Sequence, residues 1–417
     1  STGTYYDGVT HAKAEENLIL YSQDISQWAF DDGTRAYDVT TAPDGTVTAD
    51  SFVANTAGVN SALKLQPSTF TSGTVSFYIK ANGTNYIRLR RNSGLGSANI
   101  DITSGAGSVG TVTGVFSNVS ITDVGNGWHR VSLYADLGSS FWYIRIYPTD
   151  ATYAENSASV GTGYYIWGAQ LEQRSSVTAY TATTTQPITN YIPVLQSAAA
   201  GEARFDHDPV TGESKGLLIE EQRTNLLTYS EDFSNGVWPK QSVTVNADAT
   251  IAPNGTLTAD RLIPSNGTSV RILRGVSHDS SYTSSLYVKS EGWRHFGFLL
   301  GTSVATQRVV FDLLDGDIAG QDDGVTIASI EPVGNGWYRI SGRLISGNSS
   351  YFAPTFFNSS SIYSTTISKA DGYSGVYVWG AQLEQGSFST FYIATSGSQA
   401  TRNADSGSIT AGTVGTR

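Results

Sequence analysis

The chain has 417 residues and a formal net charge of −11, and charged residues make up only 15% of the sequence. This acidic balance excludes nucleic acid and anionic membranes as the main partners, because both attract basic surfaces. The sequence has no cysteine, which excludes disulfide bonds and thiolate chemistry, so stability has to come from packing. No apolar run reaches the roughly 18 residues of a membrane-spanning helix, so we expect no membrane insertion.

A lead-in over residues 1–16 precedes a segment, 17–185, whose motifs return in the same order in a second segment, 225–400. The strings "NLILYSQD", "APDGTVTAD", "SFYIK" and "VGNGWHR" correspond to "NLLTYSED", "APNGTLTAD", "SLYVK" and "VGNGWYR". The heptapeptide "WGAQLEQ" is identical in both segments, at 167–173 and 379–385. The offset stays between 208 residues (17 to 225) and 212 residues (167 to 379). This spacing predicts one duplicated domain and not a solenoid, whose unit recurs every ~20–50 residues.

Short runs rich in aromatic and β-branched residues fill both segments, among them "TVSFYIKA", "FWYIRIYP", "SSLYVKS" and "GWYRISGRLI". Gly, Asn and Ser bound these runs and none sustains an apolar helical stripe, which favours strands. In "VYVWGAQLE", regular alternation places Tyr377, Trp379, Ala381 and Leu383 on one strand face. We therefore expect an all-β protein with two tandem antiparallel β-sandwich domains of the jelly-roll type.

Residues 186–224 are expected to link the two domains. Within them, "RFDHD" and "KGLLIEE" flank the turn-forming string "PVTGES", a pattern typical of a β-hairpin. Residues 401–417 are small and polar, which indicates a C-terminal linker or tail. The chain contains no methionine, even at position 1, so we expect it to be part of a longer protein.

Three segments resemble tail-fibre and other host-recognition proteins of tailed bacteriophages and prophages: "STGTYYDGVTHAKAEENL", "RFDHDPVTGESKGLLIEEQRTNLL" and "WGAQLEQGSFSTFYIATSGSQATRNAD". The strand pattern "YTSSLYVK…GWYRI…VYVWGAQLE" is similar to carbohydrate-binding modules with a galactose-binding-like jelly roll. The resemblance covers nearly the whole chain and is most specific over residues 204–227. It implies non-catalytic domains along a fibre, a homotrimer, contacts with other virion proteins, and an extracellular location on an external appendage of the virion.

None of the usual catalytic motifs is present, since the sequence lacks GxSxG, a P-loop and HExxH. Its five histidines are scattered. Glu172 and Glu384 are equivalent positions of two separate domains, whereas the two carboxylates of a glycosidase lie within roughly 5–10 Å of each other. We therefore expect a protein that is not an enzyme.

The repeated aromatic residues have a structural explanation, because both domains must fill the same core and corner positions. This explanation applies to Trp128, Trp167, Tyr180, Trp337, Trp379 and Tyr392, for which ligand binding is the alternative. The two "GNGW" strings are expected to close hairpins, because Asn and Gly accept positive φ.

Binding specificity is expected where the two copies differ. The string "SEGWRHFGF" places Trp293, Arg294 and His295 just past a strand of the second domain. A Trp ring beside hydrogen-bond donors suits a sugar, because the ring packs on the C–H side of a pyranose while the donors fix its hydroxyls. The alternative is an ordinary surface loop or an interface with a neighbouring chain.

Two strings of the first domain predict a patch of aromatic and basic side chains. Alternation puts Tyr86, Arg88 and Arg90 of "YIRLRRNS" on one strand face, and it groups Tyr143, Arg145 and Tyr147 of "FWYIRIYP". If the two strands are neighbours, the Arg side chains suit carboxylate or sulfate groups of an acidic glycan. The alternative is a solvated sheet face with compensating acids.

Asp206 and Asp208 of "DHD" are candidate ligands of a structural calcium ion, which related sandwich modules often carry. The string lacks the spacing of a known calcium loop, so turn-forming aspartates are the alternative. No other cofactor is expected.

Together these features predict a non-enzymatic structural and adhesion segment of a phage tail fibre or similar virion appendage, whose tandem modules bind bacterial surface polysaccharide. Repetition of modules raises weak single-site affinity. Two alternatives stay open. One is a purely structural virion spacer or decoration protein without a ligand, and the other is an accessory carbohydrate-binding part of a larger polysaccharide-degrading enzyme.

Overall fold

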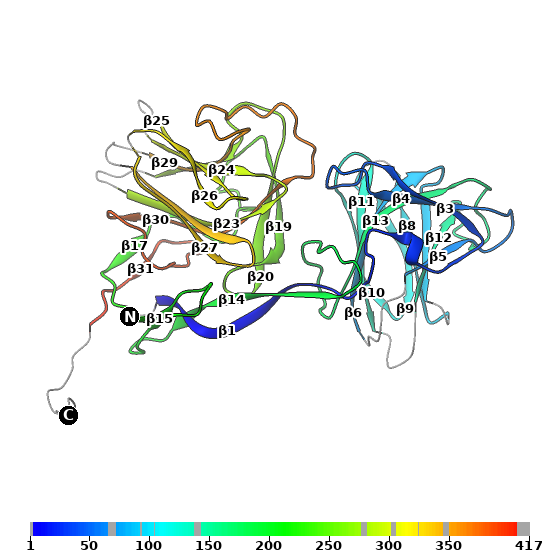
Figure 1. Ribbon diagram of the computed structural model, residues 1–417, viewed down its shortest axis with the longest axis horizontal. Coiled ribbons are helices and arrows are strands. Elements are labelled where there is room, and N and C mark those ends of the chain that lie inside the picture. Colours follow the sequence, from blue (N-terminus) through cyan, green and yellow to red (C-terminus); the bar gives the residue numbers. More distant parts are fainter. Residues whose placement is uncertain are drawn as a thin grey trace. The chain divides into compact units, whose positions relative to one another are not determined.

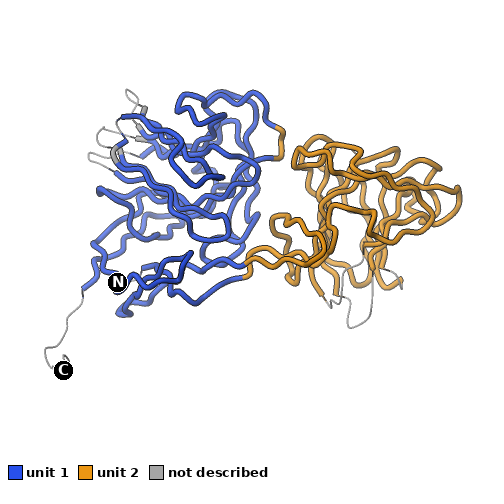
Figure 2. Tube along the Cα trace, in the orientation of Figure 1, with its two compact units in different colours: residues 1–12, 191–370, 374–417 blue, residues 13–190, 371–373 orange. Residues whose placement is uncertain are grey.

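The computed structural model describes residues 3–65, 72–91, 94–103, 105–136, 143–276, 282–301, 306–323, 325–344 and 350–406. Contacts divide the chain into two compact units (Figure 2). Unit 2 comprises 13–190 with 371–373 and contains the first repeat, and unit 1 comprises 1–12, 191–370 and 374–417 and contains the second. Most of the predicted lead-in and linker therefore lies within the compact unit of the second repeat.

The first repeat is a sandwich of two six-stranded sheets (Figure 1). The sheet that carries the heptapeptide, here called the motif sheet, has the order β10-β11-β6-β13-β4-β3, and the opposite sheet has the order β2-β5-β12-β7-β8-β9. A short 3-10 helix, η1 (Ile25–Gln27), precedes them. The strands are β2 (Phe30–Asp31), β3 (Gly33–Thr40), β4 (Ala49–Ala54), β5 (Ala62–Leu65), β6 (Ser72–Asn82), β7 (Tyr86–Arg91), β8 (Gly96–Asp101), β9 (Ser108–Gly114), β10 (Phe116–Asp123), β11 (Trp128–Asp136), β12 (Ile144–Thr149) and β13 (Gly163–Glu172).

The second repeat has the same arrangement. Its motif sheet has the order β19-β20-β30-β23-β28-β27, and its opposite sheet has the order β18-β21-β29-β24-β25-β26, with β22 also paired to β29. The strands are β18 (Lys240–Gln241), β19 (Val243–Ile251), β20 (Leu257–Pro264), β21 (Arg271–Ile272), β22 (Arg274–Val276), β23 (Tyr282–Glu291), β24 (His295–Gly301), β25 (Thr306–Asp312), β26 (Asp317–Gln321), β27 (Val325–Gly334), β28 (Trp337–Leu344), β29 (Ser350–Phe356) and β30 (Gly375–Gln385).

The predicted all-β fold with two tandem antiparallel sandwiches is confirmed. Three smaller pairs complete the described part of the chain: β1 (Gly3–Asn17) with β14 (Ile188–Ala198), β15 (Phe205–His207) with β16 (Ser214–Leu217), and β17 (Arg223–Asn225) with β31 (Ala400–Arg402). The β15–β16 pair is the hairpin expected around "PVTGES". Among the residues that the structure describes, no helix is long and apolar enough to cross a membrane.

The predicted face of "VYVWGAQLE" is wrong. Val376 and Val378 lie in the main core of the second repeat together with Ala381 and Leu383, whereas Trp379 lies outside that core. A register irregularity in the pairing of β30 with β23 separates the two halves of the string. Gly380, at φ 64°, lies at this β-bulge, which shifts the alternation by one residue.

The rest of the heptapeptide fixes the chain that follows the strand. In the first repeat, the carboxamide of Gln170 donates to the carbonyl of Ala179 at 3.0 Å and accepts from the N–H of Thr181 at 2.7 Å. Glu172 accepts hydrogen bonds from the N–H and hydroxyl of Thr178. Equivalent bonds join Gln382 to Ile393 and Glu384 to Thr390. The heptapeptide is therefore repeated because it specifies a central strand of the motif sheet and the path of the chain that follows this strand.

The aromatic cluster on the outer face of the motif sheet also recurs. In the first repeat it joins Tyr78, Trp128, Trp167 and Tyr180, and the ring centroids of Trp167 and Tyr180 lie 4.7 Å apart. The corresponding rings of Trp379 and Tyr392 lie 4.6 Å apart. Both "GNGW" strings form turns with positive φ at the Asn and the flanking Gly residues, as expected.

Substitution of the bulge glycine should be costly. An alanine Cβ at Gly168 (φ 61°) would lie 2.9 Å from Cδ2 of Tyr78, whereas one at Gly58 (φ 74°) would meet no atom within 4 Å. Both variants pay for the left-handed backbone, about 1–2 kcal/mol, but Gly168→Ala must also displace a packed ring, for a total of about 2–4 kcal/mol. Calorimetric unfolding of the two variants measures this difference, and equal losses would contradict the role given to the bulge.

In each repeat, a buried aspartate accepts hydrogen bonds from two backbone N–H groups at equivalent positions. Asp50 accepts hydrogen bonds from the N–H groups of Ile25 and Asp38, both at 2.9 Å. Asp260 accepts those of Phe233 at 2.7 Å and Asp248 at 3.0 Å. Burial raises the pKa of both carboxyls, that of Asp260 to about 6. In the second repeat, the carboxyl group of Asp260 is therefore held away from water, which makes its ionisation less favourable.

This raised pKa predicts a pH-dependent stability. Native Asp260 binds its proton more tightly than the unfolded chain does, so its contribution favours folding near pH 4 and is lost as the pH rises through about 6. The free energy of unfolding of the wild type minus that of Asp260→Asn should fall by about 1–3 kcal/mol between pH 4 and pH 7. Calorimetry of the second repeat's transition measures it, with Asp323→Asn, at an exposed position of the same repeat, as control. A difference independent of pH would refute the assignment.

Candidate functional site

The predicted aromatic and basic residues of the first repeat share one face of the opposite sheet. Along β7, Ile87 and Leu89 enter the core, while the alternating residues Tyr86, Arg88 and Arg90 face outward. The register of β12 places Arg145 opposite Arg90 and Tyr147 opposite Arg88. On the other side of β12, Lys64 of β5 lies opposite Arg145. We call this surface the basic face, and it comprises Lys64, Tyr86, Arg88, Arg90, Tyr143, Arg145 and Tyr147.

Two carboxylates hold the cations of the basic face. Asp31 pairs with Lys64 at 2.5 Å and with Arg145 at 3.0 Å. Burial alone would raise the pKa of Asp31, but hydrogen bonds and charge from the two cations lower it. Glu155 pairs with Arg88 at 3.4 Å and also with Arg90. Compensating acids are thus present, as expected for the alternative of a solvated sheet face. Four cations, however, share only two carboxylates.

The tyrosines of the basic face flank these cations. Tyr143 lies with its ring 4.7 Å from the guanidinium of Arg145 and 5.5 Å from the ammonium of Lys64. Burial raises the pKa of Tyr147 to about 12, so its hydroxyl stays protonated. Arg90 has the most exposed of the three arginine side chains, at 38%. The face therefore offers water-accessible guanidinium groups beside neutral aromatic rings.

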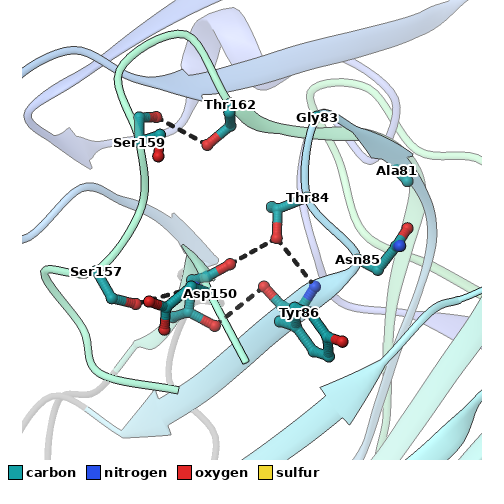
Figure 3. Close-up of a pocket in the computed structure, with 10 residues that line it drawn as sticks. Ala81, Gly83, Thr84, Asn85, Tyr86, Asp150, Ser157, Ser159 and Thr162 are labelled. Carbon is teal, nitrogen blue, oxygen red and sulfur yellow. Dashed lines mark hydrogen bonds between the residues drawn. The ribbon is translucent and has the colours of Figure 1, made fainter. Parts of the chain in front are cut away.

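An open pocket of about 480 Å³ adjoins the basic face at the start of β7 (Figure 3). Tyr86 lines it together with Thr84, Asn85, Asp150, Ser157 and other small residues. The hydroxyl of Thr84 donates to the carbonyl of Thr149 at 2.5 Å and accepts from the N–H of Tyr86 at 3.1 Å. Hydrogen bonds from Thr152 lower the pKa of Asp150, so an ionised carboxylate lies at the pocket.

At the positions equivalent to Arg90 and Arg145, the second repeat carries apolar residues and no cation. Its β24 and β29 pair in the same register, with Leu299 opposite Ala353 where the first repeat has Arg90 opposite Arg145. Leu299 and Ala353 form a small apolar cluster with Val310 and Phe357. The two positions are therefore occupied by apolar packing, while Arg308 of the neighbouring strand lies opposite Leu299 and pairs with Asp322.

The predicted glycan residues of the second repeat are occupied by contacts within the chain. Trp293 is half-buried against the core, and its N–H donates to the carbonyl of Phe357 at 3.1 Å. Its ring meets Phe356 edge-on at 5.7 Å. Arg294 is exposed but pairs with Asp312 and Asp315, and burial lowers the pKa of His295, 3.6 Å from Asp312. The three residues do lie together, but the indole is packed on its neighbours.

Asp206 and Asp208 use their carboxylates within the protein. Asp206 accepts a hydrogen bond from the N–H of Tyr6 at 3.1 Å, and burial raises its pKa. Asp208 accepts from the N–H groups of Val210 and Thr211, which lower its pKa, and lies 3.4 Å from the ammonium of Lys215. Over the described ranges, no group of three or more potential metal ligands gathers.

The repeated residues are mostly buried. Trp128, Trp337 and Trp379 are each 1% exposed, Trp167 is 3% and Tyr392 is 2%, while Tyr180 is half-buried. Glu172 and Glu384 are fully buried and bind a threonine of their own repeat. Neither carboxylate is therefore open to a substrate.

Sequence reasoning missed the pocket and the two acids of the basic face. Asp150 of the pocket and Glu155 of the basic face are more than 60 residues from Thr84 and Arg90 in the chain, and only the pairing of β7 with β12 brings these segments together. Asp31 is likewise 114 residues from Arg145. Lys64 carried a usable signal, because it alternates with the buried Leu63 and Leu65 in a short strand.

No family model and no curated protein matches the chain. Among solved structures, one match is the N-terminal CBM22-1–CBM22-2 tandem domain of Xyn10C from Paenibacillus barcinonensis, with 12% identity and a TM-score of 0.24, over 89% of this chain and 97% of that one. Another is the tandem CBM51 modules of Sp3GH98, a family 98 glycoside hydrolase from Streptococcus pneumoniae, with 12% identity and a TM-score of 0.20, over 92% and 99%. Similarity at this level leaves the function to be argued from the site itself.

The packing of Trp293 predicts that it stabilises the second repeat. Trp293→Ala should lower the free energy of unfolding by about 2–4 kcal/mol, because it removes a half-buried ring and leaves the carbonyl of Phe357 without its donor. Lys369→Ala removes an exposed side chain of the same repeat; it is the control and should leave the free energy of unfolding nearly unchanged. Calorimetry resolves the two cases. Equal and small losses would show that the indole is a free surface group.

Proposed function

We propose that the chain is a non-catalytic carbohydrate-binding segment whose first repeat binds acidic polysaccharide through the basic face. The observation that carries this proposal is the cross-strand register, in which Arg145 has Lys64 on one side and Arg90 on the other. Like charges directly opposite each other destabilise a sheet. Asp31 and Glu155 offset part of that repulsion, and an anionic ligand would offset more of it, which gives the arrangement a use.

The chemistry of the basic face fits a sugar acid. Planar guanidinium groups such as those of Arg88 and Arg90 bind carboxylate or sulfate groups through paired hydrogen bonds. The rings of Tyr86 and Tyr143 supply apolar faces for the C–H side of a pyranose. An acidic chain with a local basic face binds anionic glycan at that face without a general affinity for nucleic acid.

The setting that we propose is the tail fibre or a similar external appendage of a phage, in which the segment contacts bacterial surface polysaccharide. Support comes from the sequence resemblance of residues 204–227 to host-recognition proteins. A homotrimer and contacts with other virion proteins belong to the same proposal. The basic face would serve equally in an accessory part of a polysaccharide-degrading enzyme, the kind of protein to which the matched Streptococcus modules belong.

Binding to an array of acidic and neutral bacterial polysaccharides tests the function. We expect the protein to bind acidic polysaccharides, with affinity lowered about tenfold in Arg88→Ala and in Arg90→Ala, and weakened as salt is raised. Arg294→Ala, an acid-paired arginine of the second repeat, is the control and should bind as the wild type does. A folded protein that binds no polysaccharide on the array would leave the purely structural spacer as the better explanation.

A further inference from the structure

One residue at the pocket differs between the repeats, although its side chain makes the same kind of hydrogen bond to a backbone carbonyl in both. In the first repeat the side chain of Thr84 donates to the carbonyl of Thr149. In the second, the side chain of Trp293 donates to the carbonyl of Phe357. Both residues follow a glycine that bridges to the strand of the heptapeptide, Gly83 to Gly163 and Gly292 to Gly375. Thr84 and Trp293 are therefore structural equivalents.

The two side chains leave very different amounts of space. Thr84 lines an open pocket of about 480 Å³ in the first repeat. At the equivalent place the indole of Trp293 packs on Phe356 and on the core of the second repeat. The neighbouring positions change with it, since Asn85 and Tyr86 correspond to Arg294 and His295, and the basic face gives way to the cluster around Leu299 and Ala353.

We infer that the pocket beside Thr84 is a subsite for a neutral sugar residue, and that Trp293 closes the equivalent place in the second repeat. This inference rests on the proposed function and makes it specific to the first repeat. The pocket's volume lies within the ~300–1,000 Å³ of small-molecule sites. A polysaccharide that places a neutral residue here sets its acidic neighbour on the basic face, because Tyr86 belongs to both.

The lining of the pocket selects for hydroxyl groups. Among the described residues, the carboxamide of Asn85 has no hydrogen-bond partner, so both its donor and its acceptor are available to a ligand. The carboxylate of Asp150 is exposed and accepts hydrogen bonds from Thr152. It can accept further bonds from sugar hydroxyls, and it repels carboxylate or sulfate groups. A neutral polyhydroxylated ring fits these groups better than a uronic acid does.

The second repeat supplies the residue that tests this inference. Thr84→Trp places the indole in the pocket, where its N–H can make the bond to Thr149 that Trp293 makes to Phe357. We expect Thr84→Trp to fold and to lower the affinity for array polysaccharides at least tenfold. Methyl glycosides of neutral hexoses should compete with the polysaccharide for the wild type. Trp293→Thr is the matched control and should leave the affinity within twofold of the wild type.

A second variant covers the case in which Thr84→Trp is misfolded. Asn85→Ala removes the carboxamide without filling the pocket, and it should lower the affinity about fivefold and weaken competition by the neutral glycosides. The pocket inference is wrong if a folded Thr84→Trp and Asn85→Ala both bind as the wild type does while Arg88→Ala and Arg90→Ala lose affinity. The proposed function itself fails if the wild type binds no polysaccharide. Competition by uronic acids alone would also refute the neutral subsite.

Discussion

The glycine that follows the repeated tryptophan is the constraint on which each sandwich depends. Its positive φ interrupts the alternation of the strand, so that Trp167 stays on the outer face with Tyr78 while Ala169 and Leu171 enter the core. A side chain at Gly168 would collide with the ring of Tyr78. The amide and carboxylate that follow then fix the chain beyond the strand, so one short string secures both layers of packing and the next turn.

Because the motif sheet supplies these stabilising contacts, the outward residues of the opposite sheet can change. The motif sheets keep equivalent aromatic residues in both repeats, together with equivalent buried Asp, Gln and Glu side chains that accept equivalent hydrogen bonds from the backbone. Two central outward positions of the opposite sheets differ in their chemistry, because Arg90 and Arg145 in one repeat correspond to Leu299 and Ala353 in the other. At these two positions, a duplicated scaffold thus carries a polar surface in one repeat and apolar packing in the other.

The same physical limits explain what the sequence could predict. Strict alternation held in β7, so the shared face of Tyr86, Arg88 and Arg90 followed from the sequence. It failed in β30, because a bulge is set by the backbone conformation of one glycine and leaves no trace in the period. A Trp in a polar loop looked like a sugar platform, since its partners in Phe356 and Phe357 lie more than 60 residues away in the chain. The pocket depends on a similar long-range meeting.

The cost of the basic face argues for its use. A sheet is more stable when opposite charges or apolar side chains face each other across strands, and the second repeat realises the apolar solution with Leu299 and Ala353. The first repeat instead keeps Arg145 between Lys64 and Arg90 and needs Asp31 and Glu155 to hold them. Folding alone gives no reason for charged residues at these positions, because the same scaffold in the second repeat folds with apolar residues there. Departures from local stability of this kind concentrate where a protein meets a ligand.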